Sequence, residues 1–382
     1  MALNEAPAVA VLGSTGSIGC QALDVAGRLG LRVASIAAGS NVDAVEAQAR
    51  QFLPEVAALY NEGAARELKI RLADTPVRVY GGAEGVEVAA RMGNIALNGI
   101  VGIRGLAPTL AAIDAGHTVA LANKETLVCA GMIVNHRAAE KGVRILPVDS
   151  EHSAVFQCLQ GNERALRRVI LTCSGGAFYG KTRAETYRMT RREALAHPNW
   201  RMGEKITVDC ATLMNKGLEC IEAMRLFGVG IDAVEVLIHR ESIVHSLIEL
   251  TDGAVLGQLG VPDMRLPIQY ALTYPERMPC SAEALHLAGR QLTFAEPDTD
   301  AFPCLKLARE AAARSDAACA VLNGANEQAV ARFLHGEIVF GQIADAVAHA
   351  LETVPERTLA DTEDVYEIDR EARAAADVFI NR

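Results

Sequence analysis

The segment AVAVLGSTGSIG, residues 8–19, decides the fold class of this 382-residue chain. A short apolar run is followed by three glycines spaced G-x-x-G-x-x-G, and an apolar helical pattern then runs from Ala22 to Ala26. A strand, a glycine turn and a helix in this order place backbone N–H groups at a helix N-terminus, where they bind a pyrophosphate. We therefore interpret the segment as a dinucleotide-binding turn, in preference to an ordinary strand-to-helix turn.

The end of the next strand bears on the choice of dinucleotide. An apolar run at 33–38 is followed by Gly39, Ser40 and Asn41, with no acidic residue. Sites specific for NAD usually place Asp or Glu there to bind the ribose 2′-hydroxyl. Small neutral donors instead suit a 2′-phosphate, and the sequence therefore predicts NADP(H).

Strand and helix patterns continue to alternate through the first 150 residues. Apolar runs at 56–60, within 94–101, at 118–122 and at 143–148 fit strands, and 106–115 fits a helix. Such alternation predicts a parallel, doubly wound α/β sheet, which binds its ligands beyond the carboxyl ends of the strands. The polar residues expected at that edge are Asn123, Lys124, Glu125, Asp149 and Glu151.

Composition limits the class of protein. Half of the residues are hydrophobic, the net charge is -10 and no long basic run occurs, so we expect neither nucleic acid nor a membrane as partner. The nine cysteines are scattered without a C-x-x-C pair, which is typical of thiols in a reducing compartment. The sequence shows no signal peptide and no apolar run long enough to span a bilayer, and it predicts a cytoplasmic protein.

Two carboxylates stand close together in the segment PVDSEH, residues 147–152. On extended backbone Asp149 and Glu151 point the same way. A cation that prefers oxygen ligands, such as Mg²⁺ or Mn²⁺, would relieve their repulsion. The alternative is a helix start at which Asp149 or Ser150 caps and Glu151 lies in the first turn. Judged on this stretch alone, a helix cap is the commoner arrangement. The rest of the chain favours a metal site instead.

Two further polar segments follow. An apolar run at 169–172 leads into Cys173-Ser174-Gly175-Gly176, which predicts either a small anion-binding nest or a plain glycine turn. The segment 179–205 is basic and irregular, and includes His197 and the only tryptophan, Trp200. A large aromatic side chain in such a segment favours a lid that excludes water on closure, with a hydrophobic plug as the alternative.

The stretch ITVDC, residues 206–210, is interpreted as another strand end. The helix after it is expected to carry Asn215, Lys216 and Glu219 within about one turn. A lysine beside an asparagine suits a phosphate group, and Glu219 adds a third carboxylate for a metal ion. An ion pair on a solvated helix face is the alternative.

The last third of the chain shows no clear catalytic group. The runs 244–250 and 254–259 alternate around a Thr-Asp-Gly turn, which predicts a β-hairpin. Residues 275–303 are interpreted as a linker, and the chain after Leu305 as helical. An apolar stripe is expected in that helical region at Val339, Ile343, Val347 and Leu351.

Six motifs occur in order along the chain. They are Gly13-Ser-Thr-Gly-Ser-Ile-Gly19, Ala122-Asn-Lys-Glu125, Val148-Asp-Ser-Glu-His152, Ser174-Gly-Gly176, His197-Pro-Asn-Trp200 and Met214-Asn-Lys-Gly-Leu-Glu219. Together they resemble the 1-deoxy-D-xylulose 5-phosphate reductoisomerase family. The resemblance implies an NADPH- and metal-dependent rearrangement and reduction to 2-C-methyl-D-erythritol 4-phosphate, in non-mevalonate isoprenoid synthesis. It also implies a homodimer, paired through a sheet of the middle domain.

The resemblance assigns roles to individual residues. A divalent ion (Mg²⁺, Mn²⁺ or Co²⁺) would be held by Asp149, Glu151 and Glu219, and it would polarise the substrate's oxygens as a Lewis acid. With Lys124 these residues form the implied catalytic set. The implied substrate contacts are Lys124, Ser150, Glu151 and Glu219 at the reacting end, Ser174, Cys210, Asn215 and Lys216 at the phosphate, and His197 and Trp200 closing over it. The implied NADPH contacts are Thr15, Gly16, Ser17, Ile18, Gly39, Ser40, Asn41, Asn123, Glu125 and Gly203. His245 and Met264 also match active-site positions.

Two departures from the family pattern stand out. Cys210 occupies a position where the family usually has a serine for the phosphate, and a thiol is a weaker donor. His239-Arg240-Glu241-Ser242 replaces the usual His-Pro-Gln-Ser, a change that the sequence alone does not explain.

The expected domains are an NADPH-binding domain at 1–149, a catalytic and dimerisation domain at 150–274 with the lid 179–205, a linker at 275–303 and a helical domain at 304–382. Two rival functions are weighed. One is a two-domain NADP-dependent aldehyde or homoserine-type dehydrogenase with Cys173 or Cys210 as nucleophile, which would need no metal. The other is an NADP(H)-sensing binding protein, and the lack of a basic DNA-binding helix argues against it.

Overall fold

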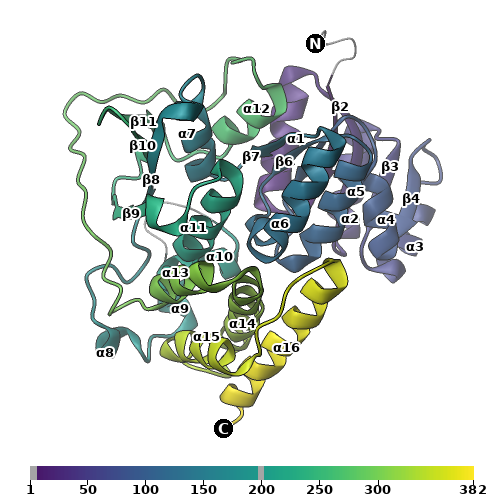
Figure 1. Ribbon diagram of the computed structural model, residues 1–382. Coiled ribbons are helices and arrows are strands. Elements are labelled where there is room, and N and C mark those ends of the chain that lie inside the picture. The colour runs from purple at the N-terminus through teal and green to yellow at the C-terminus, as the bar shows by residue number, and fades with distance from the viewer. Residues whose placement is uncertain (1–6, 197–201) are drawn as a thin grey trace. The chain divides into compact units, whose positions relative to one another are not determined.

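A computed structural model describes residues 7–196 and 202–382, and this part of the chain forms two compact units (Figure 1). The first unit takes in the chain up to Thr126, then Val134–Ser153 and Asp263–Ala282. The second takes in Leu127–Ile133, Ala154–Pro262 and Glu283–Arg382. Both units are discontinuous in sequence. The four-part domain division expected from the sequence stays a prediction.

The core of the first unit is a parallel sheet. Within the described residues it has seven strands in the order β4-β3-β2-β1-β5-β6-β7. Val9, Val11 and Leu12 of β1 are wholly buried. Helices cover both faces of a parallel sheet, and its central strands are therefore continuous apolar runs. The predicted α/β fold is confirmed. The strands are β1 (Ala8–Leu12), β2 (Arg32–Ala38), β3 (Val56–Leu59), β4 (Arg78–Gly81), β5 (Ile95–Asn98), β6 (Thr118–Leu121) and β7 (Ile145–Pro147).

Helices cover both faces of this sheet. The chain moves outward from β1 to β4 and then crosses back to β5, so right-handed crossovers place α1 to α3 on one face and α4 and α5 on the other. The reversal makes a topological switch between β1 and β5, where doubly wound sheets bind their ligands. The helices of this part are α1 (Ser17–Leu29), α2 (Val42–Phe52), α3 (Glu62–Arg71), α4 (Gly82–Ala90), the 3-10 turn η1 (Ile103–Gly105), α5 (Leu106–Asp114), α6 (Lys124–Lys141), α7 (Ser150–Leu159) and α12 (Arg265–Thr273). Helices α6 and α7 contribute residues to both units.

The second unit is built on a mixed sheet of four strands, counted within the described residues, in the order β11-β10-β8-β9. Strand β8 pairs antiparallel with β10 and parallel with β9, and β10 and β11 form the predicted hairpin. The edge strand β9 is bridged by Ala295 opposite Ile238, whereas the outer edge of β11 pairs with no other strand of the described chain. The strands are β8 (Leu166–Cys173), β9 (Val234–Ile238), β10 (Val244–Leu250) and β11 (Val255–Leu259). The sequence patterns had pointed to neither β4 nor β9.

The predicted strand end at 206–210 is wrong, since these residues lie in helix α10 (Glu204–Ala211). Isoleucine, threonine and valine favour strands when they face a pleated surface. Here Thr207, Val208 and Ala211 are buried on one helical side, where α10 packs on α11 (Met214–Phe227) and α14 (Asp316–Leu334). Tertiary packing thus outweighs local preference. Leu213, in the left-handed region with φ 60, makes the sharp turn into α11.

The region after Leu305 is helical, as expected. Gly217 of α11 lies so close to α13 that a Cβ there would stand 2.5 Å from the Cβ of Ala308. In the apolar stripe Ile343, Val347 and Leu351 are buried, and Val339 precedes the helix. The remaining elements are the 3-10 turns η2 (Glu163–Ala165) and η3 (Ile231–Ala233), with helices α8 (Arg183–Thr186), α9 (Arg191–Ala194), α13 (Cys304–Arg314), α15 (Gly341–Thr353) and α16 (Thr362–Ile380). Among the described residues, none of the helices combines the length and apolarity needed to cross a membrane.

Candidate active site

The glycine turn predicted at 8–19 links β1 to α1 at the topological switch of the first unit. Gly13 and Ser14 both donate a backbone N–H to the carbonyl of Ala37 at 2.8 Å, which ties the turn to β2. Gly16 and Ser17 are exposed, and no side chain among the described residues caps the start of α1. An exposed helix start whose first N–H groups carry no side-chain cap is the arrangement that an anion-binding site requires.

Gly19 permits the close approach of α1 to the turn. A Cβ on this residue would lie 2.2 Å from the carbonyl oxygen of Gly13 and 2.5 Å from Cα of Ser14, both backbone atoms. We expect Gly19→Ala to weaken NADPH binding by roughly ten- to a hundredfold, the equivalent of about 1–3 kcal/mol of overpacking. Fluorescence titration with NADPH measures this. Gly27→Ala on the same helix meets only the ring of Phe52, at 3.6 Å, and should bind NADPH normally. Equal affinities in the two variants would contradict the prediction.

The end of β2 is open to a ligand. Gly39, Ser40 and Asn41 are all exposed, and the side-chain oxygen of Asn41 caps α2 by accepting from the N–H of Ala44 at 3.1 Å. With its oxygen engaged, Asn41 presents its amide N–H₂ as a donor. This local chemistry agrees with the sequence-based preference for a 2′-phosphate.

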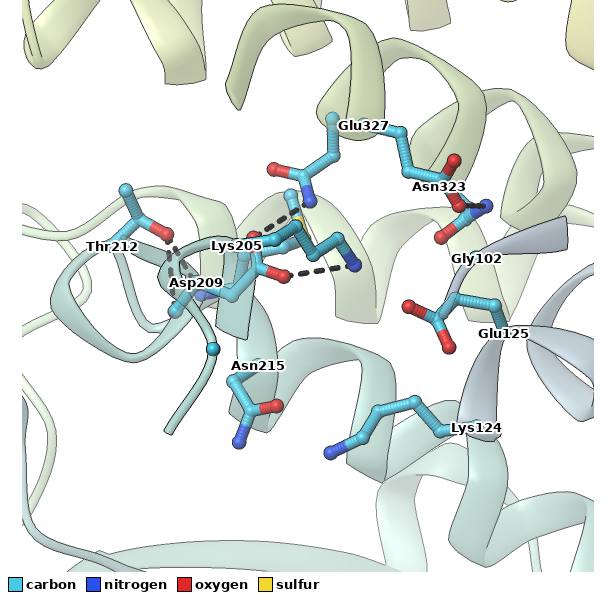
Figure 2. Close-up of polar contacts among 12 residues, drawn as sticks. Gly102, Lys124, Glu125, Lys205, Asp209, Thr212, Asn215, Asn323 and Glu327 are labelled. Atoms are coloured by element: carbon cyan, nitrogen blue, oxygen red, sulfur yellow. Dashed lines mark hydrogen bonds and ion pairs between the residues drawn. The ribbon is translucent and has the colours of Figure 1, made fainter. Parts of the chain in front are cut away.

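The end of β6 carries three buried polar residues, Asn123, Lys124 and Glu125. Asn123 caps α6 and donates to the carbonyls of Ile100 at 2.6 Å and Gly102 at 2.8 Å. It also donates to Glu125 at 3.1 Å. Asn123 thereby joins the ends of β5 and β6, and Figure 2 shows Lys124 and Glu125 projecting from the start of the helix that it caps.

The pair Asp149 and Glu151 does not lie on extended backbone, and that part of the sequence interpretation is wrong. Helix α7 begins at Ser150, Glu151 lies in its first turn, and the backbone carbonyl of Asp149 accepts from Ser153 at 2.8 Å. The two carboxylates still bring oxygens within 4.8 Å of each other. The Asp149 carboxylate lies 2.5 Å from Nζ of Lys124, and Ser150 donates to Glu151 at 2.5 Å. The helix-start geometry and the close carboxylates therefore coexist.

In the second unit a glycine loop follows β8. Ser174 is buried, and its hydroxyl accepts from the N–H of Gly176 at 3.3 Å. Both Gly175 and Gly176 have positive φ, 77 and 69. Gly176 is pressed against the end of α10, because a Cβ there would lie 2.4 Å from the carbonyl oxygen of Cys210. The loop thus lies against the backbone of Cys210, and the phosphate site itself stays a prediction.

The start of α11 carries the other residues predicted for that site. Lys216 and Glu219 form an ion pair whose side chains are 2% and 1% exposed. Asn215 donates to the second carboxylate oxygen of Glu219 at 2.5 Å. The alternative of an ion pair on a solvated helix face is wrong, since all three residues are buried.

One polar cluster was missed by sequence reasoning. Asp209 is almost fully buried and accepts from Asn326 of α14 at 2.8 Å. Nζ of Lys205 lies 2.9 Å from the same carboxylate, and Figure 2 shows this ion pair as a dashed line. The cluster fixes the end of α10 directly before Cys210. The spacing of Lys205 and Asp209 is that of a helical i, i+4 pair, a signal that the strand assignment of 206–210 concealed.

His245 of β10 is a buried neutral base. Burial lowers the pKa of this imidazole to about 4, and the charge of Lys216 acts in the same direction, while a hydrogen bond with the backbone of Val261 opposes them. The unfolded chain, with an ordinary histidine pKa of about 6.5, therefore binds more protons than the folded chain between these two values. The stabilising contribution is complete above about pH 6.5 and is lost as the pH falls toward 4.

We expect the free energy of unfolding to fall by about 3 kcal/mol on acidification across this window through His245 alone. Urea unfolding at a series of pH values measures the decrease. His245→Gln, which cannot titrate, should show a correspondingly shallower dependence. An identical pH dependence in both proteins would contradict the assignment.

The segment 179–205 is only partly irregular. Helices α8 and α9 begin with capping boxes at Thr182 and Thr190. Tyr187 donates its hydroxyl to Asp345 of α15 at 2.8 Å, and its carbonyl accepts from Gly341 at 2.8 Å. This part of the predicted lid is therefore anchored to the C-terminal helices. His197 and Trp200 lie outside the described residues, and the lid stays a prediction.

Three family models match the chain. The first, 1-deoxy-D-xylulose 5-phosphate reductoisomerase, matches residues 9–131. The second, the 1-deoxy-D-xylulose 5-phosphate reductoisomerase C-terminal domain, matches residues 145–227. The third, the DXP reductoisomerase C-terminal domain, matches residues 259–375. A curated protein of that name from Acetivibrio thermocellus is 49% identical over 376 residues, covering 97% of this chain and 99% of its own length. The chain belongs to the 1-deoxy-D-xylulose 5-phosphate reductoisomerase family. The resemblance inferred from the six motifs is thereby confirmed.

Solved structures of the reductoisomerase family share the whole fold. The Zymomonas mobilis enzyme in complex with NADPH is 41% identical, with a TM-score of 0.92, and the match covers 98% of this chain and 99% of that one. A reductoisomerase in complex with NADPH, fosmidomycin and magnesium is 38% identical, with a TM-score of 0.94 and 98% coverage of both chains. The dehydrogenase alternative is not favoured, since these matches run through both units.

Proposed function

We propose that this chain converts 1-deoxy-D-xylulose 5-phosphate to 2-C-methyl-D-erythritol 4-phosphate, using NADPH and a divalent cation. The observation that carries the proposal is its likeness over 98% of its length to a reductoisomerase holding NADPH, fosmidomycin and magnesium. The chain's own residues support it, because each described motif position carries the side chain that the chemistry needs.

NADPH is assigned to the carboxyl edge of the parallel sheet. Its pyrophosphate would lie on the exposed start of α1, at Thr15, Gly16, Ser17 and Ile18. Its 2′-phosphate would accept hydrogen bonds from Gly39, Ser40 and Asn41. Asn123, Glu125 and Gly203 complete the proposed contacts. The buried hydrogen bonds of Asn123 suit it to fix the shape of this edge.

A divalent cation is assigned to Asp149, Glu151 and Glu219. These residues offer oxygen atoms only, which is the donor set that Mg²⁺ and Mn²⁺ prefer. Such an ion supplies a Lewis acid for the carbonyl and hydroxyl oxygens of the substrate. Ser150 orients the Glu151 carboxylate through its 2.5 Å hydrogen bond. Lys124, held beside Asp149, brings a positive charge and N–H donors to the reacting end of the substrate.

The substrate phosphate is assigned to Ser174, Asn215 and Lys216, with Cys210 at their side. A buried ammonium, an amide and a hydroxyl are strong donors for an anion. The thiol of Cys210 is a weaker one, and its contact stays a proposal. His197 and Trp200 are proposed to cover the bound substrate and exclude water.

The test follows NADPH oxidation spectrophotometrically. Turnover is expected with 1-deoxy-D-xylulose 5-phosphate and Mg²⁺, is expected to stop when EDTA removes the metal, and should be much slower with NADH at the same concentration. Identification of the product as 2-C-methyl-D-erythritol 4-phosphate confirms the rearrangement. Activity that survives the chelator would instead support a metal-independent dehydrogenase.

We also propose that the enzyme is a homodimer paired through β11. This strand is an open edge, and its Val255, Leu256 and Leu259 are 51%, 37% and 37% exposed. Apolar edge strands are usually covered by another chain. Light scattering should give twice the chain mass of 40.6 kDa. Leu256→Lys should shift the protein toward the monomer, and a monomeric wild type would contradict the proposal.

Because of this substrate and product, we also propose that the reaction belongs to isoprenoid precursor synthesis. A cytoplasmic location likewise stays a prediction. Among the described residues, no two cysteines form a disulfide.

A further inference from the structure

The turn after β9 is one of the two places where the sequence departs from the family pattern. His239 accepts backbone N–H bonds from Ile243 at 3.2 Å and Val244 at 3.1 Å through Nε2, while its Nδ1 lies 2.9 Å from the carbonyl of Thr293. Glu241 accepts from the hydroxyl of Thr293 at 2.7 Å. The residues on either side of Arg240 are therefore held in place, and the Arg240 side chain starts from a fixed base.

The guanidinium of Arg240 reaches the glycine loop. It donates to the carbonyl of Ser174 at 2.5 Å and to that of Gly176 at 3.1 Å, and it lies over the ring of Tyr179, 5.0 Å from the centroid. One side chain thus holds two of the three carbonyls in the Ser-Gly-Gly segment. The aromatic ring supports the guanidinium from one side.

The consequence for the loop follows from peptide geometry. In a trans peptide the C=O and the following N–H point in opposite directions. Carbonyls drawn toward Arg240 therefore turn the N–H groups of Gly175 and Ala177 away from it, as in an anion-binding nest. Two successive glycines of positive φ have many other conformations available, so the loop needs an external restraint to keep this one.

Both departures from the family pattern meet at Gly176. Arg240 holds its carbonyl, and the backbone of Cys210 is packed against its Cα.

We propose that Arg240 is a positioning residue for the substrate phosphate, which keeps the Ser174–Gly176 loop in its anion-binding form. This inference rests on the proposed function for the identity of the phosphate ester. The role requires no contact between Arg240 and the substrate.

The test compares Arg240→Ala with wild type in kinetics and in phosphate binding. We expect KM for 1-deoxy-D-xylulose 5-phosphate to rise about tenfold, with kcat changed less than threefold and the NADPH affinity unchanged. Arg240→Lys keeps one donor group, and its KM should lie between those of the wild type and Arg240→Ala. Millimolar guanidinium should lower KM in Arg240→Ala and leave the wild type unaffected. A rise in KM of less than threefold, or an equal loss of NADPH affinity, would overturn the role.

Arg309→Ala is the matched control. Arg309 also donates to two backbone carbonyls of this unit, Val234 at 2.7 Å and Ile231 at 3.3 Å, in a turn without a proposed site residue. Its loss should leave KM unchanged.

Calorimetric titration with inorganic phosphate is independent of turnover. We expect the wild type to bind inorganic phosphate, and Arg240→Ala to bind it about tenfold more weakly. If the wild type binds phosphate in this way but does not turn over the sugar phosphate, the proposed function fails and the positioning role stands. Equal phosphate affinities, or no phosphate binding by the wild type, would overturn it.

Discussion

Glu151→Gln is expected to lower kcat by about three orders of magnitude while the affinity for NADPH stays within twofold of wild type. The reason is the proposed ligand role: a metal ion contributes several kcal/mol to stabilising developing charge, and about 1.4 kcal/mol corresponds to a tenfold change in rate. Glutamine has nearly the same shape as glutamate but brings a neutral amide in place of the charged carboxylate. Steady-state kinetics at saturating Mg²⁺ and fluorescence titration with NADPH measure the two effects.

The control for this variant is Glu163→Gln. Glu163 is the next glutamate along the chain and is exposed, with its carboxylate accepting from the N–H of Gly161 at 3.1 Å. Its turnover should equal that of the wild type. Should Glu151→Gln retain a tenth or more of the wild-type kcat, the ligand role of Glu151 would be refuted. A joint loss of turnover and NADPH binding would point to misfolding instead.

The parts of the fold that depend on local pattern could be predicted from the sequence. Strands such as Ala8–Leu12 are continuous apolar runs, and the glycine turn that follows has few structural meanings in that context. The α/β class, the hairpin of β10 and β11 and the helical C-terminal region all follow from such patterns. The patterns missed two strands: β4, whose Arg78–Gly81 is short and only half apolar, and β9, Val234–Ile238.

The errors at the site arise where tertiary contacts decide. Residues 206–210 have strand-forming side chains, yet burial against α11 and α14 makes them a helix. The sequence pattern predicts that Asp149 and Glu151 lie together on extended backbone. In the structure, the start of α7 brings their oxygens within 4.8 Å of each other. The role proposed for Arg240 depends on its hydrogen bonds to a loop about 65 residues earlier in the chain, and no local pattern contains that relation.

Lys216→Met is expected to have the second large effect, on substrate binding and on stability together. Its ammonium is the strongest donor proposed for the phosphate, and losing charged hydrogen bonds should raise KM by roughly ten- to a hundredfold. Glu219, whose side chain is 1% exposed, would lose its cationic partner. Breaking a buried pair from one side should lower the free energy of unfolding by about 3 kcal/mol. Steady-state kinetics and urea unfolding report the two losses separately.

A second substitution separates these causes. In the double variant Lys216→Met, Glu219→Gln no buried charge is left without a partner, so most of the stability should return, because the penalty belongs to the unpaired carboxylate. Activity should stay lost, since the phosphate donor and a metal ligand are both missing. Lys306→Met on α13, an exposed lysine of the same unit, should alter neither quantity. If the double variant regained turnover, or if Lys216→Met bound substrate as tightly as the wild type, Lys216 would be a structural partner of Glu219 and the phosphate would have to be held by other donors.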